Sequence, residues 1–426
     1  MEVIPRPSRL TAAGNRMPGY QQAWSGMEKL QRMGSGRTKL TVLCDMSEAR
    51  VRGRIAGEKS RRKSFSESGG SSCHLPTVLW AGLFATAVLV FAGCGHPAPM
   101  ASAKSEASEE AVRFSSGDAI LAGTLALPAG TQRHPAVVLF HGSGPQSRDL
   151  FTARWFAAHG IAALAYDKRG VGESSGDFKK IPFMDLCDDG LAGLAYLKSR
   201  KEIDSRHIGV WGLSQGGWLG PLAASRSSDT SFVIAVSGPG VSPGQQMLFY
   251  YAEELRARGV AESDVLEATA LRREVWDYMS SGKGYEKARE GLENARGKRW
   301  YNEVKKQQDG LFDPLPAPSE LSKPVGRSLL WFGHEMNYDP VPALKALRVP
   351  ALFLFGDQDR LVQVKESVDI IRQTLTQSGN KDFTIRVFPQ VDHGMRLVSG
   401  EGEGSIDPEY LETMAKWLAA HVGASN

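Results

Sequence analysis

The sequence predicts an α/β fold, in which a mostly parallel sheet of eight strands is covered by helices on both faces. Strand-like and helix-like segments alternate from about residue 112 onward, which is the pattern of a parallel sheet with helical connections. Several strand candidates, among them "AVVLF", "IAALAY" and "ALFLF", are continuous apolar runs bounded by Pro, Gly or Asp. Such runs are typical of central strands that are buried on both faces of the sheet.

The strand candidates lie, in chain order, at residues 112–115, 119–127, 136–140, 161–166, 208–212, 232–236, 351–355 and 384–388. Helical candidates between them include residues 183–199 and 365–377. Residues 240–346, between the sixth and seventh strands, hold no strand candidate and contain amphipathic segments such as "GQQMLFYYAEELRARG". We therefore expect one domain at residues 112–424, with a helical cap inserted at residues 240–346.

The expected cap is rich in aromatic residues, and we expect most of them to pack the cap onto the body of the domain. These residues are Phe249, Tyr250, Tyr251, Trp276, Tyr278, Trp300, Tyr301, Trp331 and Phe332.

Charge is unevenly distributed along the chain. Residues 1–74 hold 14 lysines and arginines and 6 acidic residues, so they carry +8; because the whole chain carries +4, the remainder carries −4. A mildly acidic body argues against nucleic acid as a partner. Residues 1–74 show little periodicity, and we expect either a disordered basic extension or a later translation start, with Met46 as a candidate.

An uncharged run, "LPTVLWAGLFATAVLVFAG", follows the basic patch "KSRRK" and ends directly before Cys94. This layout at residues 75–94 is typical of a secretory signal or a signal anchor. The end "FAGC" resembles a bacterial lipoprotein processing site, which predicts lipidation of Cys94; an uncleaved anchor helix and a buried core helix are the alternatives. Residues 95–111 are polar and irregular, and we expect a flexible tether there.

The cysteines and histidines give little indication of a disulfide or a metal site. Only Cys187 of the four cysteines lies in the expected domain, which excludes a disulfide within it. The chain contains no Cys-x-x-Cys and no His-Glu-x-x-His pattern, so we expect no zinc site.

Two stretches match Gly-x-Ser-x-Gly, a pattern that can hold a nucleophilic serine on a sharp turn. Ser214, in "IGVWGLSQGGWLG", directly follows a strand candidate and directly precedes a helical candidate. Ser174, in "AYDKRGVGESSGDF", is separated from its strand by a glycine-rich stretch and has no helix after it. Ser214 is therefore the predicted nucleophile, since a helix N-terminus favours the negative charge that develops in acyl transfer.

A serine needs a base, and the base needs a group that orients it. His393, in "VFPQVDHGM", follows the last strand candidate and is the predicted base. Asp357 and Asp359 follow the seventh strand candidate, and Asp359 is preferred because it lies further out on the loop. Asp392 is disfavoured, since neighbours in a loop rarely face each other well. The order Ser, Asp, His is the chain order of one serine-hydrolase fold.

The segment "HGSG" after the third strand candidate is predicted to form an oxyanion hole with the start of the helix after Ser214. The backbone N–H groups of Ser143 and Gln215 are the expected donors, and His141 is expected to support the loop structurally.

The segments "HGSGP", "YDKRGVGESSG", "GLSQGG", "GDQD" and "DHGM" resemble the α/β-hydrolase superfamily. The resemblance is to the bacterial carboxylesterase branch related to serine aminopeptidases and prolyl-oligopeptidase-like hydrolases, and it covers about residues 112–424 outside the cap. It implies the α/β-hydrolase fold, the triad, the oxyanion loop and hydrolysis of a small-molecule ester without metal or cofactor. Peptide hydrolysis, acyl transfer and thioester hydrolysis stay open as alternatives. A binding lipoprotein without activity is disfavoured, because every triad position is filled.

Overall fold

The computed structural model describes residues 107–178, 181–306, 311, 313–321, 335–400 and 403–423. The predicted basic segment 1–74, the segment 75–94 with Cys94, and residues 95–106 of the predicted tether lie outside these residues. Trp331 and Phe332 of the predicted cap lie outside them as well.

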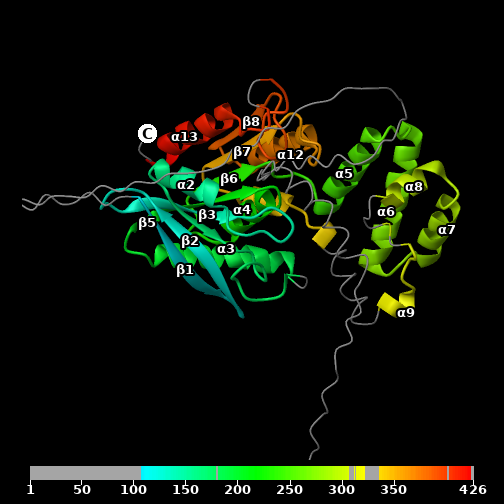
Figure 1. The fold of residues 1–426 in the computed structure, drawn as a ribbon, viewed down its shortest axis with the longest axis horizontal. Coiled ribbons are helices and arrows are strands. Elements are labelled where there is room, and N and C mark those ends of the chain that lie inside the picture. The colour runs from blue at the N-terminus through cyan, green and yellow to red at the C-terminus, as the bar shows by residue number, and fades with distance from the viewer. Residues whose placement is uncertain are drawn as a thin grey trace, which may run out of the picture. The chain divides into compact units, whose positions relative to one another are not determined.

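Within the described residues, eight strands form one sheet, as the sequence predicts (Figure 1). They are β1 (Ser108–Ser116), β2 (Ala119–Leu127), β3 (His134–Phe140), β4 (Ala162–Tyr166), β5 (Ile203–Leu213), β6 (Val233–Val236), β7 (Ala351–Gly356) and β8 (Phe383–Phe388). Their order in the sheet is β1-β2-β4-β3-β5-β6-β7-β8. The β1–β2 and β2–β4 pairs are antiparallel, and the other pairs are parallel. The carboxyl ends of β3, β5, β6 and β7 therefore meet at one edge.

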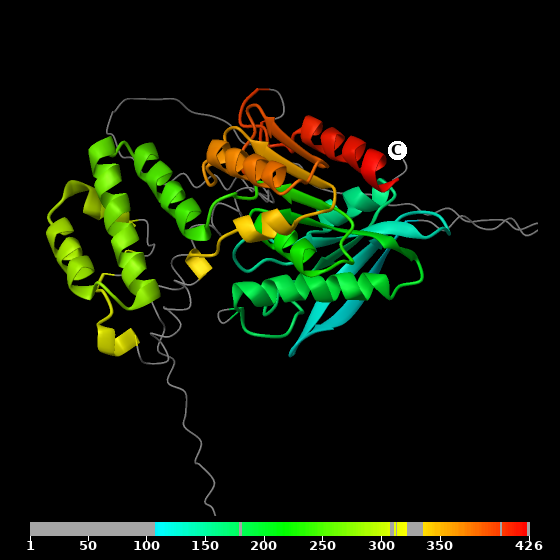
Figure 2. The same ribbon diagram turned by 180° about the vertical axis from the view of Figure 1, so that it is seen from behind.

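Some of the helices cover the two faces of the sheet. In chain order, the helices of the described residues are α2 (Leu150–Ala158), α3 (Phe183–Lys198), α4 (Gln215–Arg226), α5 (Pro243–Ala257), α6 (Glu262–Ser281), α7 (Tyr285–Ala295), α8 (Arg299–Lys306), α9 (Pro318–Leu321), α11 (Val341–Ala346), α12 (Val364–Gln377) and α13 (Pro408–Val422). Residues of α3, α4, α11 and α12 share a core with one face, and residues of α2 and α13 share a core with the other. Figures 1 and 2 show these two layers on opposite sides of the sheet.

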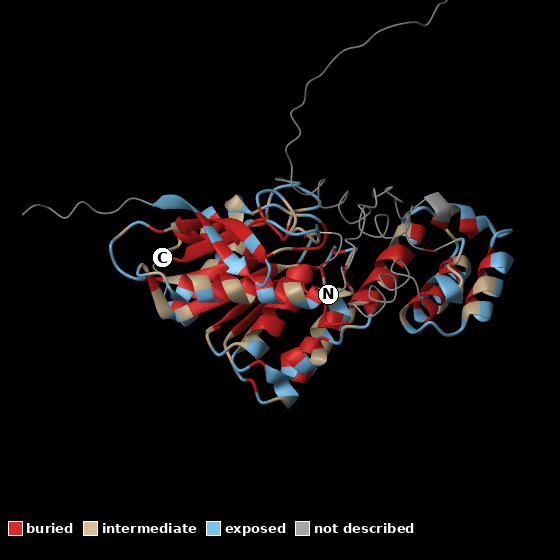
Figure 3. Ribbon diagram, turned by 90° about the horizontal axis from the view of Figure 1, so that it is seen from below, coloured by how far each residue is buried: buried red, intermediate tan, exposed pale blue. Residues whose placement is uncertain are grey.

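Alternate residues of the central strands fill the two cores. In β3, Val138 and Phe140 belong to the core under α3 and α4, whereas Val137 and Leu139 belong to the core under α2 and α13. Figure 3 shows buried residues along the strands and on the inward faces of the helices that cover them. This two-sided burial explains why the strands appear in the sequence as continuous apolar runs.

The structure corrects two predicted boundaries. β1 begins at Ser108, four residues before the predicted start of the domain, so residues 108–111 pair with β2 instead of forming part of a tether. The predicted cap ends too late, because Ala343 and Leu344 of α11 are buried in the core that α3, α4 and α12 cover. None of the helices in the described ranges is both long and apolar enough to cross a bilayer.

The helices α5 to α8 have a hydrophobic core of their own, which corrects the prediction that the cap aromatics pack mainly onto the body. Six of these aromatics are buried in that core: Tyr250, Tyr251, Trp276, Tyr278, Trp300 and Tyr301. The body contributes Leu361 to its edge. The cap is joined to the body by hydrogen bonds such as that from Gln246 Nε2 to the carbonyl of Leu361.

Candidate active site

Ser214 lies between the end of β5 and the start of α4, at the carboxyl edge of the sheet. Its backbone has φ 57° and ψ −111°, a combination of angles that residues other than glycine rarely adopt. The amide of Ser214 donates to the carbonyl of Val236 at 2.8 Å, which attaches the turn to the end of β6. β5, α4 and β6 together hold Ser214 in this strained conformation. A sharp turn between a strand and a helix is where a nucleophilic serine can be held.

The glycines around Ser214 allow this sharp turn. A Cβ atom on Gly212 would lie 2.2 Å from the carbonyl oxygen of Gly216, and one on Gly216 would lie 2.8 Å from the carbonyl oxygen of Phe140. Both contacts are with backbone atoms, so a side chain at either position would push the strand and the helix apart. The Gly-x-Ser-x-Gly pattern is thus required here by close packing.

Asp359 and His393 meet at the same edge of the sheet. His393 Nδ1 donates to Asp359 Oδ2 at 2.7 Å, and the carboxylate is fully buried. The other oxygen, Oδ1, accepts hydrogen bonds from the amides of Leu361 at 2.8 Å and Val362 at 3.0 Å. Burial opposes the charged ring, but the Asp359 and Asp392 carboxylates outweigh it and raise the pKa of His393.

The competing aspartates have other partners. Asp357 Oδ1 accepts from the amide of Gln390 at 2.7 Å. Asp392 Oδ1 accepts from the amides of Gly394 and Arg396 and so stabilises the turn that carries His393. Of the three carboxylates, the structure brings Asp359 to the ring of His393.

One segment links His393 to the Ser214 turn. Ser237, directly after β6, donates from Oγ to the carbonyl of His393 at 2.9 Å, while Val236 accepts from the amide of Ser214. Nε2 of His393 is buried and hydrogen-bonds no group within the described residues, Ser214 included. Catalytic hydrogen bonds are often formed only when substrate binds.

The two predicted oxyanion donors line one pocket. Ser143 and Gln215 are both buried where they line this pocket. Gln215 is the first residue of α4, so its amide has no partner within the helix. The walls are largely apolar, with Phe183 and Trp218 from the body and Met247 from the cap among the lining residues.

Two titratable residues of the site, Lys168 and Glu335, were not predicted from the sequence. Lys168 is 2% exposed and donates from Nζ to the carbonyls of Gly142 and Gly144 and to Gln215 Oε1. Glu335 lines the pocket and accepts a hydrogen bond from the amide of Phe183. The sequence signal for Lys168 was its place in "YDKRGVGESSG", directly after a buried strand.

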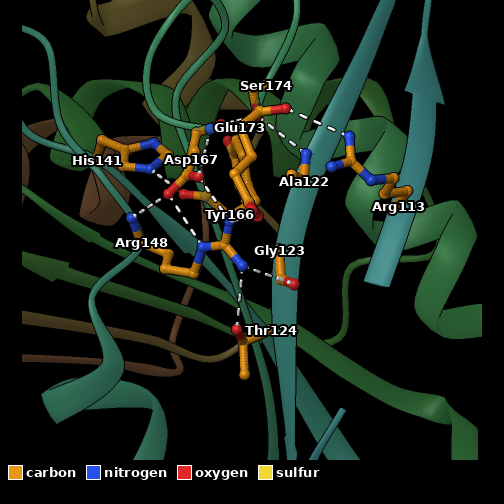
Figure 4. Close-up of polar contacts among 10 residues, drawn as sticks. All are labelled: Arg113, Ala122, Gly123, Thr124, His141, Arg148, Tyr166, Asp167, Glu173 and Ser174. Atoms are coloured by element: carbon orange, nitrogen blue, oxygen red, sulfur yellow. Dashed lines mark hydrogen bonds and ion pairs between the residues drawn. The ribbon is translucent and has the colours of Figure 1, made fainter. Parts of the chain in front are cut away.

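Ser174, in the second Gly-x-Ser-x-Gly stretch, has a structural position. Its side chain is buried, and Oγ donates to the carbonyl of Asp167 at 2.6 Å and accepts from the amide of Ala122 at 2.9 Å (Figure 4). The bond from Ala122 ties the loop after β4 to strand β2, and the bond to Asp167 closes the loop on itself. A Cβ atom on Gly172 would lie 2.5 Å from Asp167 Oδ2, so this glycine serves the loop as well.

Asp167 joins that loop to the residues after β3 (Figure 4). Arg148 donates from Nε and its amide to Asp167 Oδ1, and from Nη2 to Asp167 Oδ2 at 2.6 Å. Burial opposes ionisation of Asp167, but Arg148 and backbone donors outweigh it and lower its pKa to about 2. His141 donates through Nε2 to the carbonyl of Tyr166 at 2.5 Å, which fits its expected supporting role. The segments around Ser143 and Lys168 are therefore held together.

The fold agrees with the protein family that sequence comparison identifies. The family model described as "Serine aminopeptidase, S33" matches residues 131–397, more than half of the chain. The chain belongs to this α/β-hydrolase family. The matched range contains Ser143, Ser214, Asp359 and His393, together with the cap.

Several curated proteins are similar to this α/β hydrolase. Esterase EstD of Thermotoga maritima is 26% identical over 316 residues, which are 70% of this chain and 65% of EstD. The quorum-quenching protein AidA of Acinetobacter baumannii is 31% identical over 129 residues, 30% of this chain and 42% of AidA. The monoacylglycerol lipase of Mycolicibacterium smegmatis is 25% identical over 303 residues, 68% of this chain and 90% of the lipase. The matches thus span less than two thirds of EstD and of AidA.

Solved structures of α/β hydrolases are also similar. An esterase of Pyrococcus furiosus matches with a TM-score of 0.45 and 19% identity, over 74% of this chain and 91% of that chain. The α/β hydrolase GrgF of Penicillium matches with a TM-score of 0.47 and 18% identity, over 74% and 99%. The esterase and the lipase among the curated relatives support ester hydrolysis at the level of the family.

Proposed function

We propose that this protein is a serine hydrolase that cleaves carboxylic esters, with Ser214 as nucleophile, His393 as general base and Asp359 as the group that orients His393. The proposal rests on the 2.7 Å hydrogen bond between Asp359 and His393 at the sheet edge where Ser214 is held at φ 57°. A buried carboxylate on Nδ1 leaves Nε2 of the ring available to take a proton.

In the proposed reaction, Ser214 Oγ attacks the ester carbonyl carbon while His393 Nε2 takes the hydroxyl proton. The amides of Ser143 and Gln215 donate hydrogen bonds to the resulting oxyanion. His393 then gives its proton to the alkoxide oxygen as the carbon–oxygen bond breaks, so the alcohol leaves and the acyl group stays on Ser214. A water molecule that His393 deprotonates attacks this acyl-enzyme, which releases the acid and restores the Ser214 hydroxyl.

The pocket favours an ester with an uncharged apolar group over a peptide with a free amino terminus. Its wall includes Phe183, Trp218 and Met336, which suit a hydrocarbon group. A site for a substrate ammonium group needs a carboxylate, and Glu335 is the carboxyl group in this wall. Burial raises the pKa of Glu335 to about 8, so the group is largely neutral at pH 7. Aminopeptidase activity is therefore the second candidate.

A substrate panel tests this proposal on the full-length protein in detergent. We expect turnover of p-nitrophenyl esters, little turnover of aminoacyl p-nitroanilides, and stoichiometric labelling of Ser214 by a fluorophosphonate. Faster turnover of the anilides would identify a peptidase instead. Rapid transfer to added alcohols, or a strong preference for thioesters, would identify an acyltransferase or a thioesterase. Absence of both labelling and turnover would contradict a hydrolase.

We propose in addition that residues 75–94 attach the hydrolase to a membrane on its extracytoplasmic side. The support is the sequence pattern of "KSRRK", the uncharged run and Cys94, because basic residues beside an apolar run tend to stay in the cytoplasm. Lipidated Cys94 is the preferred form of attachment, and an uncleaved anchor helix is the alternative.

A further inference from the structure

Lys168 uses every hydrogen bond that an ammonium group can donate. Its Nζ lies 2.8 Å from the carbonyl oxygen of Gly142, 3.1 Å from that of Gly144 and 2.8 Å from Gln215 Oε1. These acceptors are 26, 24 and 47 residues away along the chain, so the side chain joins its own segment to the loop after β3 and to the start of α4. An ammonium group has three N–H bonds, and here each has one acceptor. The face of the Phe178 ring lies 5.7 Å from Nζ and adds a favourable contact.

The contact with Gly142 fixes the direction of an N–H group in the site. The carbonyl of Gly142 and the amide of Ser143 belong to one planar peptide unit, in which C=O and N–H point in opposite directions. Because the carbonyl points at Lys168, the Ser143 N–H points away from it. A flip of this peptide would break the bond to Lys168 and reverse the direction of the N–H. The ammonium group also polarises the peptide, which strengthens the N–H as a donor.

The other two contacts fix the neighbouring segments. The bond to Gly144 holds the loop on the far side of Ser143, where φ of Gly144 is 83°. The bond to Gln215 Oε1 reaches the first residue of α4, whose amide is the second expected donor. One side chain thus orients the Ser143 N–H and ties its loop to the residue that carries the second N–H.

We propose that Lys168 is a positioning residue of the oxyanion hole, which orients the Ser143 amide through the Gly142 carbonyl and ties that loop to Gln215 at the start of α4. This inference rests on the proposed function, because it assumes that an oxyanion forms beside Ser143 and Gln215. In this proposal Lys168 touches no reacting atom and acts through the peptide group between Gly142 and Ser143 and through the side chain of Gln215.

The charge of Lys168 is part of this role. Burial lowers its pKa to about 7, against the opposing influence of the Glu335 and Asp189 carboxyl groups. His141 also faces Lys168, but burial and the ammonium group lower the pKa of His141 to about 3, so the ring is neutral at pH 7. A neutral amine has two N–H bonds, so loss of the proton leaves one of the three acceptors without its donor.

The first test replaces Lys168 by methionine, which has similar length and no donor, in the full-length protein. Removal of an oxyanion donor costs about 10²- to 10³-fold in kcat. Because K168M misaligns the donor and does not remove it, we expect kcat for a p-nitrophenyl ester to fall by about 10- to 100-fold, while KM changes by less than about threefold.

Lys198→Met is the matched control for K168M. Lys198 is an exposed lysine at the far end of α3 that pairs with Asp229, so its loss should leave kcat unchanged. Rates are expressed per mole of Ser214 that a fluorophosphonate labels at completion, so that misfolded protein is not counted.

A K168M variant with kcat within about twofold of the parent would overturn the proposal, since the two amides would then keep their alignment without the ammonium group. A parent protein that neither labels nor turns over any ester would instead contradict the proposed function itself.

The pH profile distinguishes a positioning role of the Lys168 ammonium group from a role in packing alone. Above about pH 7 the parent should lose activity as Lys168 deprotonates, and K168M should lack this decline. An identical alkaline decline in both proteins would also count against the ammonium role.

A second variant covers the case in which K168M does not fold. Gln215→Met removes one acceptor, keeps the backbone amide and leaves Lys168 in place; we expect kcat to fall by about 3- to 10-fold, less than for a lost donor. In the double variant the two losses should not multiply, because the Gln215 side chain acts through Lys168. Unchanged kcat in Gln215→Met, or fully multiplicative losses, would overturn the proposed linkage.

Discussion

At the scale of single residues, the two serines in Gly-x-Ser-x-Gly stretches have opposite environments. Ser214 is strained at a helix start, whereas the Ser174 hydroxyl is hydrogen-bonded on both sides. We expect Ser214→Ala to remove ester turnover, by a factor on the order of 10⁶ if it acts as triad serines do. Ser174→Ala should lower the melting temperature while the rate per labelled Ser214 stays within a few fold. Steady-state kinetics with a p-nitrophenyl ester and thermal melting measure both effects, and a dead Ser174→Ala variant would refute the assignment.

The two aspartates after β7 allow a matched comparison. Asp359→Asn should lower kcat by about 10⁴-fold, because an amide in that position favours the wrong tautomer of His393. Asp357→Asn keeps an oxygen acceptor for the Gln390 amide and should change kcat by less than a few fold. Steady-state kinetics on both variants, with melting temperatures to confirm folding, make the comparison. Equal and mild losses would mean that another group orients the ring.

The pH dependence of activity follows from the raised pKa of His393. The ring must be neutral to accept a proton, so kcat/KM should fall as the pH drops through a pKa above the ordinary value of His. Asp359 is a cause of that rise, so Asp359→Asn should shift the acid limb of the profile to lower pH while it reduces the maximum. Profiles of kcat/KM between about pH 5 and 9 test this, and an unshifted acid limb would contradict the pairing.

Sequence reasoning predicted the residues that follow strands and missed those that depend on tertiary contact. Ser214, Asp359 and His393 each come shortly after a strand, and parallel strands carry their carboxyl ends to one edge. Lys168 also follows a buried strand, but the groups that accept its hydrogen bonds lie 24 to 47 residues away along the chain, so the sequence does not show that they are neighbours. Glu335 comes to the pocket from the end of the cap region, where neither periodicity nor spacing indicates a neighbour in the body.

At the scale of elements, α4 is the helix on which the proposed site depends, and it approaches the end of β6 through glycine. A Cβ atom on Gly217 would lie 2.3 Å from the Cα of Gly238, so Gly217→Ala must displace backbone. We expect it to reduce the free energy of unfolding by about 1–3 kcal/mol, and to lower kcat as well, because the shift begins close to Ser214.

Gly220→Ala in the same helix is the matched control for Gly217→Ala. Its added Cβ would meet Val210 Cγ2 at 3.5 Å, an ordinary contact, and alanine favours helix by up to about 1 kcal/mol over glycine. Stability should therefore stay the same or rise slightly. Thermal and urea unfolding of both variants measure the difference, and equal stabilities would show that the α4–β6 contact is looser than the structure indicates.

The internal division of the helical region between β6 and β7 cannot be predicted from the sequence pattern alone. Its position between two strands can be predicted, because roughly a hundred residues pass without a strand-like run. The aromatic residues of α5 to α8 serve a separate core, whereas α11 belongs to the same stretch of sequence but packs on α4 and α12. Burial against one partner or another leaves the same periodicity in the sequence.

At the scale of the whole molecule, the charge and hydropathy of the chain separate an N-terminal region from the hydrolase domain. Residues 1–74 carry +8 and are followed by an uncharged run, while the rest of the chain carries −4. The net negative charge of residues 75–426 does not favour binding to an anionic lipid surface. Attachment to a membrane would then depend on residues 75–94 and not on the surface of the catalytic domain.

The substitution Cys94→Ser distinguishes the two forms of the proposed attachment. A lipidated cysteine carries at least two acyl chains, enough for stable anchoring where one chain is marginal. If the chain is cut before Cys94, the substitution should block processing and leave a longer precursor, whereas an anchor helix should keep its size and its membrane fraction. Cys73→Ser, upstream of the apolar run, is the matched control and should change neither size nor membrane fraction. Intact-mass measurement of detergent-extracted protein decides between the two forms: acyl mass on a chain that starts at Cys94 supports lipidation, and a chain that retains residues 75–93 without acyl mass rules it out.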